Sequence, residues 1–203
     1  MKKQKKMNLF QYGIFTVVAI TLYITGLHTE IIGFAQRGLL ATGLMNPNVE
    51  EITQIRNNTS ETTTLSDFKQ ADFNLKLIDD DGAIKSLADF KGKVIFMNFW
   101  ATWCPPCVAE MPSIAKLHKE MGDQVAFVML SFDLDFEKAK AFNKRKKYDL
   151  PVYAPAADLP DIYNSSDLPT TYIIDASGNL VLTHKGMADY SDPEFRQFLN
   201  SLN

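Results

Sequence analysis

The stretch VIFMNFWATWCPPC, residues 94–107, decides how this chain folds. Its first half, Val94–Trp100, is an almost unbroken apolar run, which is typical of a central strand covered on both faces. Its second half places Cys104 and Cys107 at the beginning of a helix that we expect to end near Met121. Residues three apart in a helix are neighbours, within the Cα separation of about 4.4–6.8 Å that a disulfide requires.

The apolar pattern on either side of this stretch predicts the remaining elements. A turn is expected at 79–82 and a hairpin turn at 176–179. Further strands are expected at 73–77, 125–130, 170–175 and 180–183, and further helices at 136–147 and from Pro193 onward, with Asp192 as the N-cap. This order indicates an α/β fold with a central mixed β-sheet and helices on both faces.

The composition allows one domain with an appendage. The chain has 203 residues, of which 46% are apolar, and a formal charge of −3. Residues 1–45 carry +4, so the remainder carries −7. A mildly acidic body argues against a nucleic-acid partner, because phosphates attract a basic face.

The N-terminus has the pattern of a membrane anchor. Residues 1–8 are basic, and residues 9–27 contain no formally charged side chain. As one helix, residues 9–27 would be about 28 Å long, close to the thickness of a hydrocarbon core. We therefore expect an N-terminal transmembrane helix whose lysines stay in the cytoplasm, so that the rest of the chain lies outside it.

Two alternatives compete with the anchor. A cleaved signal peptide would have a shorter apolar segment, although Gly33-Phe34-Ala35 has the form of a cleavage site. A buried core helix fits the flanking lysines less well. We favour an uncleaved anchor, followed by a juxtamembrane stem and polar linker at 28–65 and a globular domain at 66–203.

The two cysteines are the only ones in the chain, and their spacing suggests redox chemistry. Cys104 lies where the helix begins, so the helix dipole favours its thiolate, and Cys107 lies one turn further on and can resolve a mixed disulfide. A static disulfide or half of a zinc site is the alternative. Zinc usually takes four protein ligands, and the three histidines are scattered, so we expect neither a metal nor a cofactor.

Pro105 and Pro106 fall in the first helical turn, where an amide hydrogen is not needed for helix hydrogen bonds. They remove two donors that could otherwise face the sulfur of Cys104. We therefore expect modest stabilisation of the thiolate and a cysteine pair that is more reducing than oxidising.

The segment 98–107, together with Glu110-Met111-Pro112, resembles the TlpA/ResA-like branch of the thioredoxin family. The resemblance also includes Gly92-Lys93 before the strand and Leu168-Pro169-Thr170-Thr171, Asp175 and Gly178 later, and it covers about residues 66–203. Members of this branch are membrane-anchored thiol–disulfide oxidoreductases of the thioredoxin fold that act outside the cytoplasm.

The resemblance implies the other site residues. Pro169 would follow a cis peptide bond, face the cysteines and present backbone to a partner, with Leu168 and Thr170 beside it in the substrate site. Trp103 would shield the pair and contact partners, whereas Trp100 belongs to the core. Pro112 would kink the active-site helix.

Glu110 matches the acidic residue that this branch places near the active site. If its pKa is raised by partial burial, it could relay protons to Cys107, whereas the alternative is an ordinary exposed helix glutamate. Cytosolic thioredoxins have a buried aspartate where this chain has Asn98, which cannot act as a base.

The expected function is thus reduction of disulfides in extracytoplasmic proteins through a dithiol–disulfide cycle at Cys104 and Cys107. The catalytic domain would lie on the periplasmic or extracytoplasmic side of the cytoplasmic membrane and be reduced again by a membrane electron donor. Apocytochrome c is the substrate that the resemblance suggests. The alternatives are a disulfide-forming oxidant of the same fold, and a binding module with a structural disulfide.

Overall fold

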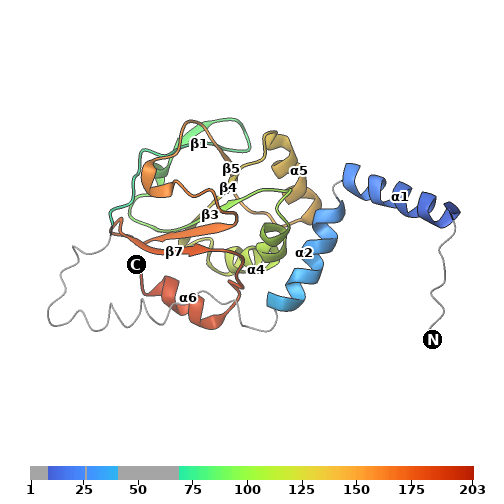
Figure 1. Cartoon of the computed structure of the whole chain (residues 1–203). Helices are drawn as coiled ribbons and strands as arrows, with labels where there is room; N and C mark the ends of the chain where they lie inside the picture. Colours follow the sequence, from blue (N-terminus) through green and yellow to red (C-terminus); the bar gives the residue numbers. More distant parts are fainter. Residues whose placement is uncertain (1–8, 26, 41–68) are drawn as a thin grey trace.

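The computed structural model describes residues 9–25, 27–40 and 69–203. The basic segment 1–8, most of the polar linker and the boundary expected at residue 66 lie outside these described residues. The description of the fold therefore concerns two N-terminal helices and the domain from Lys69 onward (Figure 1).

A seven-stranded mixed sheet forms the centre of the domain, with the strand order β2-β1-β5-β4-β3-β6-β7. Central strand β3 pairs in parallel with β4 and antiparallel with β6, so the prediction of a mixed sheet is confirmed. The strands are β1 (Lys76–Ile78), β2 (Ile84–Ser86), β3 (Val94–Trp100), β4 (Val125–Ser131), β5 (Val152–Pro155), β6 (Thr170–Ile174) and β7 (Leu180–Lys185).

Each of the three α-helices of the domain begins after a residue whose side chain caps it. They are α4 (Pro105–Met121), α5 (Phe136–Lys146) and α6 (Pro193–Asn200), and two 3-10 helices, η2 (Leu87–Phe90) and η3 (Asp161–Tyr163), complete the domain. The side chain of Asp192 accepts a hydrogen bond from the amide of Glu194, which confirms its predicted role as N-cap of α6.

Two hydrophobic clusters lie against the sheet, because successive side chains of a strand point to opposite faces. The first contains Phe96 and Trp100 together with buried residues of α4, α5 and α6. The second contains Ile95 and Phe99 together with Leu87 of η2 and Tyr163 of η3. The structure thus differs from the expected α-helical cover on both faces, since the short 3-10 helices η2 and η3 lie over the second face.

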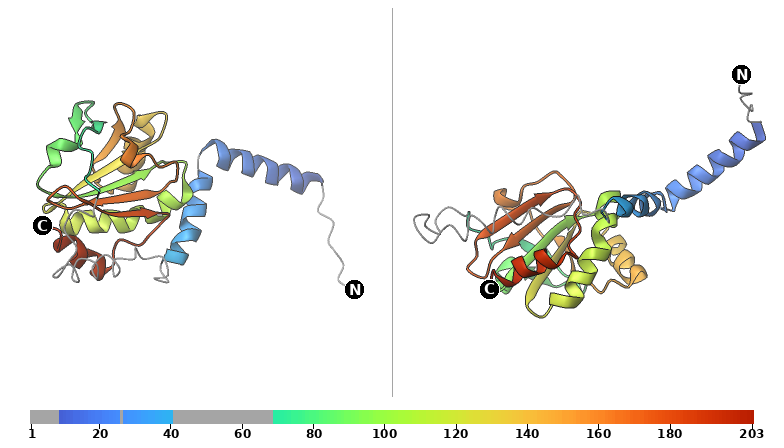
Figure 2. Two further views of the ribbon diagram at one scale, coloured as in Figure 1. Left: turned by 60° about the vertical axis from the view of Figure 1, so that its left-hand side comes forward. Right: turned by 90° about the horizontal axis from the view of Figure 1, so that it is seen from below.

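The N-terminal region is two helices, α1 (Leu9–Ile24) and α2 (Leu27–Leu40), that meet at an angle of 87° (Figure 2). The hydroxyl of Thr25 donates to the carbonyl of Thr21 at 2.7 Å, and a ring nitrogen of His28 lies 3.3 Å from the carbonyl oxygen of Leu22. The Thr21 carbonyl also keeps its helical bond from the Thr25 amide at 3.0 Å, so the hydrogen bonding of α1 continues to Thr25, before the bend. The expectation of one continuous helix over 9–27 is corrected accordingly.

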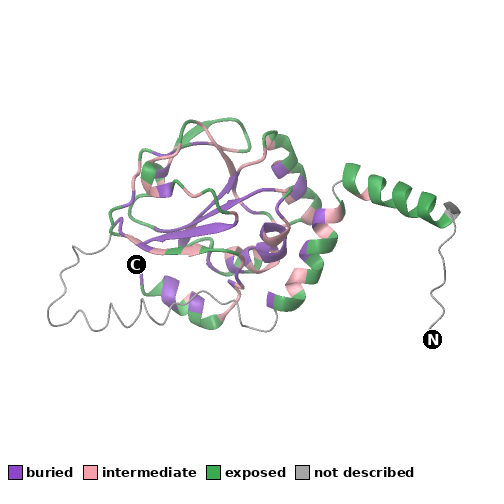
Figure 3. Cartoon of the chain, viewed as in Figure 1, coloured by how far each residue is buried: buried purple, intermediate pink, exposed green. Residues whose placement is uncertain are grey.

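Within the described residues, neither α1 nor α2 alone has the length and apolar character needed to cross a bilayer. Only Gln11–Ile24 and Leu27–Leu40 taken together satisfy both conditions, and they do so across the bend. The expected N-terminal transmembrane helix is therefore not supported as a single helix. The outer surface of α1 is nonetheless exposed almost throughout (Figure 3).

Helix α2 packs against the helix that begins at the cysteines, whereas α1 projects away from the domain (Figures 1 and 2). A Cβ atom placed on Gly33 would lie 3.0 Å from the carbonyl oxygen of Pro105, so the two helix backbones are in close contact there. Glu30 pairs with Arg145 at 2.5 Å and with Lys146 at 2.6 Å. The first part of the stem expected at 28–65 is thus a helix docked on α4 and α5.

Candidate active site

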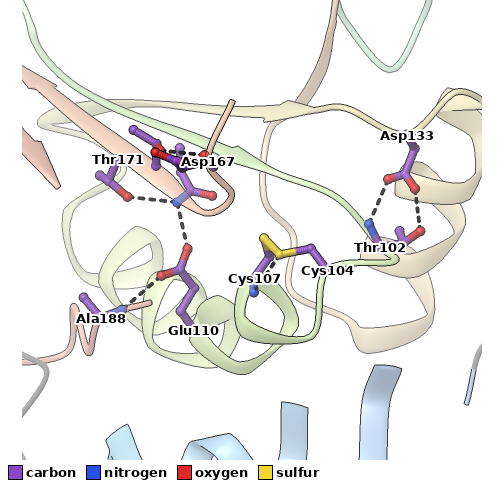
Figure 4. The surroundings of a disulfide bond; sticks show 10 residues. Thr102, Cys104, Cys107, Glu110, Asp133, Asp167, Thr171 and Ala188 are labelled. Carbon is purple, nitrogen blue, oxygen red and sulfur yellow. Dashed lines mark hydrogen bonds between the residues drawn. A yellow bond between two sulfur atoms is a disulfide. The ribbon is translucent and has the colours of Figure 1, made fainter. Parts of the chain in front are cut away.

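Cys104 and Cys107 form a disulfide at the beginning of α4, with 5.3 Å between their Cα atoms (Figure 4). Cys104 is the N-cap residue of this helix, and its Sγ accepts a hydrogen bond from the amide of Cys107 at 3.3 Å. Cys104 is 5% exposed and Cys107 is fully buried. Cys104, the slightly more accessible of the two, is the cysteine expected to meet a partner, and Cys107 is the one expected to resolve the product.

Pro105 and Pro106 occupy the first two positions of α4, as the sequence predicted. Neither residue has an amide hydrogen. Of the first three residues of the helix, only Cys107 can therefore donate a backbone hydrogen bond to the Cys104 sulfur.

Glu110 lies one turn beyond Cys107, and its side chain points into the domain (Figure 4). It is only 1% exposed, which overturns the alternative of an ordinary exposed helix glutamate. Its carboxylate accepts hydrogen bonds from the Asn98 side chain at 2.8 Å and from the Ala188 amide at 3.1 Å. Burial raises the pKa of Glu110 to about 8, although both hydrogen bonds oppose the shift by favouring the charged form.

A chain of buried polar groups continues from Glu110 into the sheet. The amide of Asn98 also donates to the hydroxyl of Thr171 at 2.9 Å, and the Tyr190 hydroxyl donates to the same oxygen at 2.7 Å. Among the described residues, the side-chain oxygen of Asn98 has no hydrogen-bond partner although it is buried. If the side-chain amide of Asn98 were turned by half a rotation, its oxygen would take the place of its nitrogen and face Glu110. The oxygen could then accept a hydrogen bond from the protonated carboxyl of Glu110.

The residues that the resemblance places around the cysteines differ in how deeply they are buried. Trp103 is 58% exposed beside the disulfide, whereas Trp100 is fully buried in the core. The Leu168–Pro169 peptide bond is cis. Thr170, the next residue, pairs with Phe99 near the end of β3. The cis bond therefore lies at the end of the strands from which β3 leads into the cysteine loop. Leu168 is half-buried against both hydrophobic clusters.

The side chain of Thr170 is fully buried, and its hydroxyl donates to the carbonyl of Asp167 at 2.7 Å. Pro112 lies inside α4, and the hydroxyl of Ser113 donates to the carbonyl of Glu110. Thr170 and Pro112 therefore support the backbone around the site. Among the interactions described, neither side chain contacts the two sulfurs.

Sequence reasoning missed three groups around Glu110. Asn98 was noted only as a departure from a buried aspartate, and its bond to Glu110 was not foreseen. Tyr190 and Ala188 lie in the loop after β7, where no motif marks them, and Ala188 contributes a backbone amide that any residue type would supply. An apolar strand with one central amide residue was the only available signal.

Comparisons with known proteins agree with this geometry. The sequence profile of the Redoxin family matches residues 58–199, which is more than half of the chain. The chain belongs to the Redoxin family. It is 38% identical over 118 residues to the thioredoxin-like protein YneN of Bacillus subtilis, covering 57% of this chain and 68% of YneN. It is 35% identical over 111 residues to the thiol-disulfide oxidoreductase ResA of the same organism, covering 53% of this chain and 62% of ResA.

Two solved structures of similar proteins have the same architecture. A thiol:disulfide interchange protein of the thioredoxin family from Chlorobium tepidum is 27% identical with a TM-score of 0.58, covering 66% of this chain and 96% of that one. The exposed lipoprotein thioredoxin of Streptococcus pneumoniae is 31% identical with a TM-score of 0.52, covering 63% and 98%. The thioredoxin fold predicted for this chain is therefore confirmed.

The chemistry available to this site is thiol–disulfide exchange. A disulfide-bonded pair at a helix N-terminus, in a Redoxin chain whose relatives carry that activity in their names, makes this protein a thiol–disulfide oxidoreductase. Within the described ranges, no group of three or more His, Cys, Asp or Glu side chains could hold a metal ion.

Proposed function

We propose that this oxidoreductase works as a reductant of protein disulfides outside the cytoplasm. The observation that carries the proposal is the amide of Cys107, the one donor that the first helical turn offers to the sulfur of Cys104. A thiolate that receives few hydrogen bonds is less stabilised, and a less stabilised dithiol state is a stronger reductant.

The proposed cycle uses both cysteines. The Cys104 thiolate attacks one sulfur of a substrate disulfide, forming a mixed disulfide and releasing the other substrate sulfur as a thiolate. Cys107 then loses its proton and attacks the Sγ of Cys104. The Cys104–Cys107 bond forms, the bond to the substrate breaks, and the substrate leaves with the two electrons.

Glu110 is the proposed acceptor of the proton that Cys107 loses. With a pKa raised to about 8, its carboxyl can both hold and release a proton near neutral pH. Its position one helical turn from Cys107 supports this role (Figure 4). Trp103 and the Leu168–Pro169 segment are the proposed contacts for the substrate backbone and its flanking side chains.

The N-terminal region is the proposed membrane-facing part of the protein. Its support is the basic segment 1–8 together with the exposed apolar side chains of α1, among them Phe15 at 62%, Val17 at 64% and Ile24 at 77%. This placement would put the domain on the extracytoplasmic side, where a membrane electron donor restores the dithiol. Apocytochrome c is the proposed substrate, on the family resemblance alone.

The test is reduction of insulin disulfides by the full-length protein, followed by trapping of the intermediate. We expect the reduced protein to cleave insulin, and Cys107→Ser to accumulate a mixed disulfide at Cys104. Cys104→Ser is the matched control and should trap nothing. A reduced protein that leaves insulin intact, together with an oxidised form that introduces disulfides into reduced ribonuclease, would reverse the proposed direction.

A further inference from the structure

A second carboxylate, Asp133, holds the loop that carries the reactive cysteine. Asp133 follows β4, and both of its oxygens accept hydrogen bonds from Thr102, two residues before Cys104 (Figure 4). The backbone amide of Thr102 donates at 3.0 Å, and its hydroxyl donates at 2.6 Å. We propose that Asp133 is a positioning residue that fixes Cys104 relative to Cys107 for thiol–disulfide exchange.

Asp133 is itself held in place from the end of β4. The buried hydroxyl of Ser131 donates to Asp133 at 2.9 Å, and the amide of Asp133 donates back to the Ser131 oxygen at 3.1 Å. The carboxylate therefore makes three hydrogen bonds, all from groups at the carboxyl ends of the neighbouring parallel strands β3 and β4. Hydrogen bonds to a charged group are shorter and roughly twice as strong as those between neutral groups.

The fixed residue lies inside the turn that delivers Cys104 to the helix. The amide of Cys104 donates to the carbonyl of Ala101 at 3.2 Å, which closes a turn with Thr102 and Trp103 at its centre. Trp103 is exposed and contributes little packing of its own to the turn. Asp133 thus accepts two hydrogen bonds from Thr102, the first central residue of the turn. The turn itself is closed by the single backbone bond from Cys104 to Ala101.

The two carboxylates stand on opposite sides of the disulfide (Figure 4). Glu110 approaches from the side of Cys107 and is suited to proton transfer, whereas Asp133 acts on the backbone before Cys104. The expected effect of Asp133 is therefore on geometry. It keeps the sulfur of Cys104 within reach of Cys107 after the disulfide opens, which raises the effective concentration of one thiol at the other.

This inference rests on the oxidoreductase activity of the Cys104–Cys107 pair. In the step that it concerns, Cys107 attacks Cys104 in a mixed disulfide, the bond between the two cysteines forms, and the partner leaves as a thiolate. A looser turn should slow this step and favour the open dithiol. It should leave the first attack by a small thiol reagent on the disulfide unimpaired, because that attack does not need the resolving cysteine.

The experiment compares Asp133→Ala, Asp133→Asn and Thr102→Val in the full-length protein, with Asp135→Ala as the matched control. Asp135 lies in the same loop, carries the same charge and makes one capping bond, to the amide of Glu137. Two quantities are measured for each variant: the equilibrium constant for oxidation by glutathione, and the rate at which the glutathione mixed disulfide at Cys104 is resolved.

We expect Asp133→Ala to lower both quantities about tenfold, the size of effect expected for losing hydrogen bonds to a charged group. Asp133→Asn keeps one acceptor oxygen, and Thr102→Val keeps the backbone bond, so both should fall between Asp133→Ala and the wild type. Asp135→Ala should lower the unfolding midpoint and leave both quantities within twofold. Thr102→Val only replaces a hydroxyl with a methyl group of similar size. It therefore keeps the test valid if Asp133→Ala fails to fold.

Two results would overturn the inference. If the Asp133 and Thr102 variants match the wild type in both quantities, or if Asp135→Ala changes them equally, Asp133 serves the stability of the fold and nothing more. If the wild type itself does not exchange with glutathione, the oxidoreductase activity fails, and this inference fails with it. The two failures are distinguishable because only the second affects the wild-type protein.

Discussion

The side-chain amide of Asn98 donates a hydrogen bond of 2.8 Å to the carboxylate of Glu110, and both residues are buried next to the redox-active cysteines. Strand β3 supplies Asn98 and helix α4 supplies Glu110, so the contact joins the centre of the sheet to the active-site helix. A buried carboxylate with only two hydrogen-bond donors is costly to keep charged. The pair therefore sets the pH range in which the site can take up and release a proton.

Glu110→Gln should change how the stability of the domain depends on pH. The folded state holds the Glu110 proton up to a pKa of about 8, whereas an unfolded glutamate releases it near its ordinary value of 4.5. Between these values unfolding releases a proton, so the free energy of unfolding falls as pH rises, by up to about 1.4 kcal/mol per pH unit. The glutamine variant should lack this slope.

Denaturant titrations of the wild type and Glu110→Gln at several pH values between 5 and 8 would measure this difference. The variant should become progressively more stable relative to the wild type across the range. Parallel stability curves would show that the pKa of Glu110 is close to normal in the folded protein. The same variant should also slow the resolving attack by Cys107, measured as the lifetime of the mixed disulfide.

Asn98→Ala should raise the pKa of Glu110 further, because it removes a hydrogen bond that favours the charged carboxylate. The pH at which exchange at Cys107 reaches half of its maximum should then move upward. Thr171→Val is the control, since it removes the other bond of the Asn98 amide and leaves the bond to Glu110 in place. An unchanged pH midpoint in Asn98→Ala would remove Asn98 from the mechanism.

Two glycines of α2 allow a paired test of its docking on α4. A methyl group on Gly33 would lie 3.0 Å from the Pro105 carbonyl oxygen, whereas one on Gly38 would meet no atom within 4 Å. Gly33→Ala should push α2 from α4 and increase amide hydrogen exchange along α2. Gly38→Ala should decrease it, since alanine favours a helix over glycine by roughly 1 kcal/mol. Equal protection of α2 in the two variants would mean that the helix is not docked in solution.

The parts of the fold with a strong local signal were predicted closely. Strand β3 and helix α4 have the predicted bounds because the apolar run and the cysteine-proline turn mark their ends. Strand β1 begins three residues later than expected, because the side chain of Asp72 accepts a bond from the Asn74 amide and holds a turn there.

Other features depend on contacts that no local pattern records. Strand β5 was missed because Val152–Pro155 is short and ends in proline, so its pairing with β1 and β4 is what makes it a strand. The bend between α1 and α2 also follows no local pattern, since residues 9–27 form one uncharged, mostly apolar run. The burial of Glu110 likewise follows from the packing of α4 on the sheet.

The most direct test of the proposed function is the reduction potential of the Cys104–Cys107 pair in the full-length protein, measured by equilibration with glutathione and dithiothreitol buffers. The single donor available to the Cys104 sulfur predicts a value near or below that of thioredoxin, about −270 mV. A value near that of a strong oxidant, about −120 mV, would contradict the proposal and make the protein a donor of disulfides.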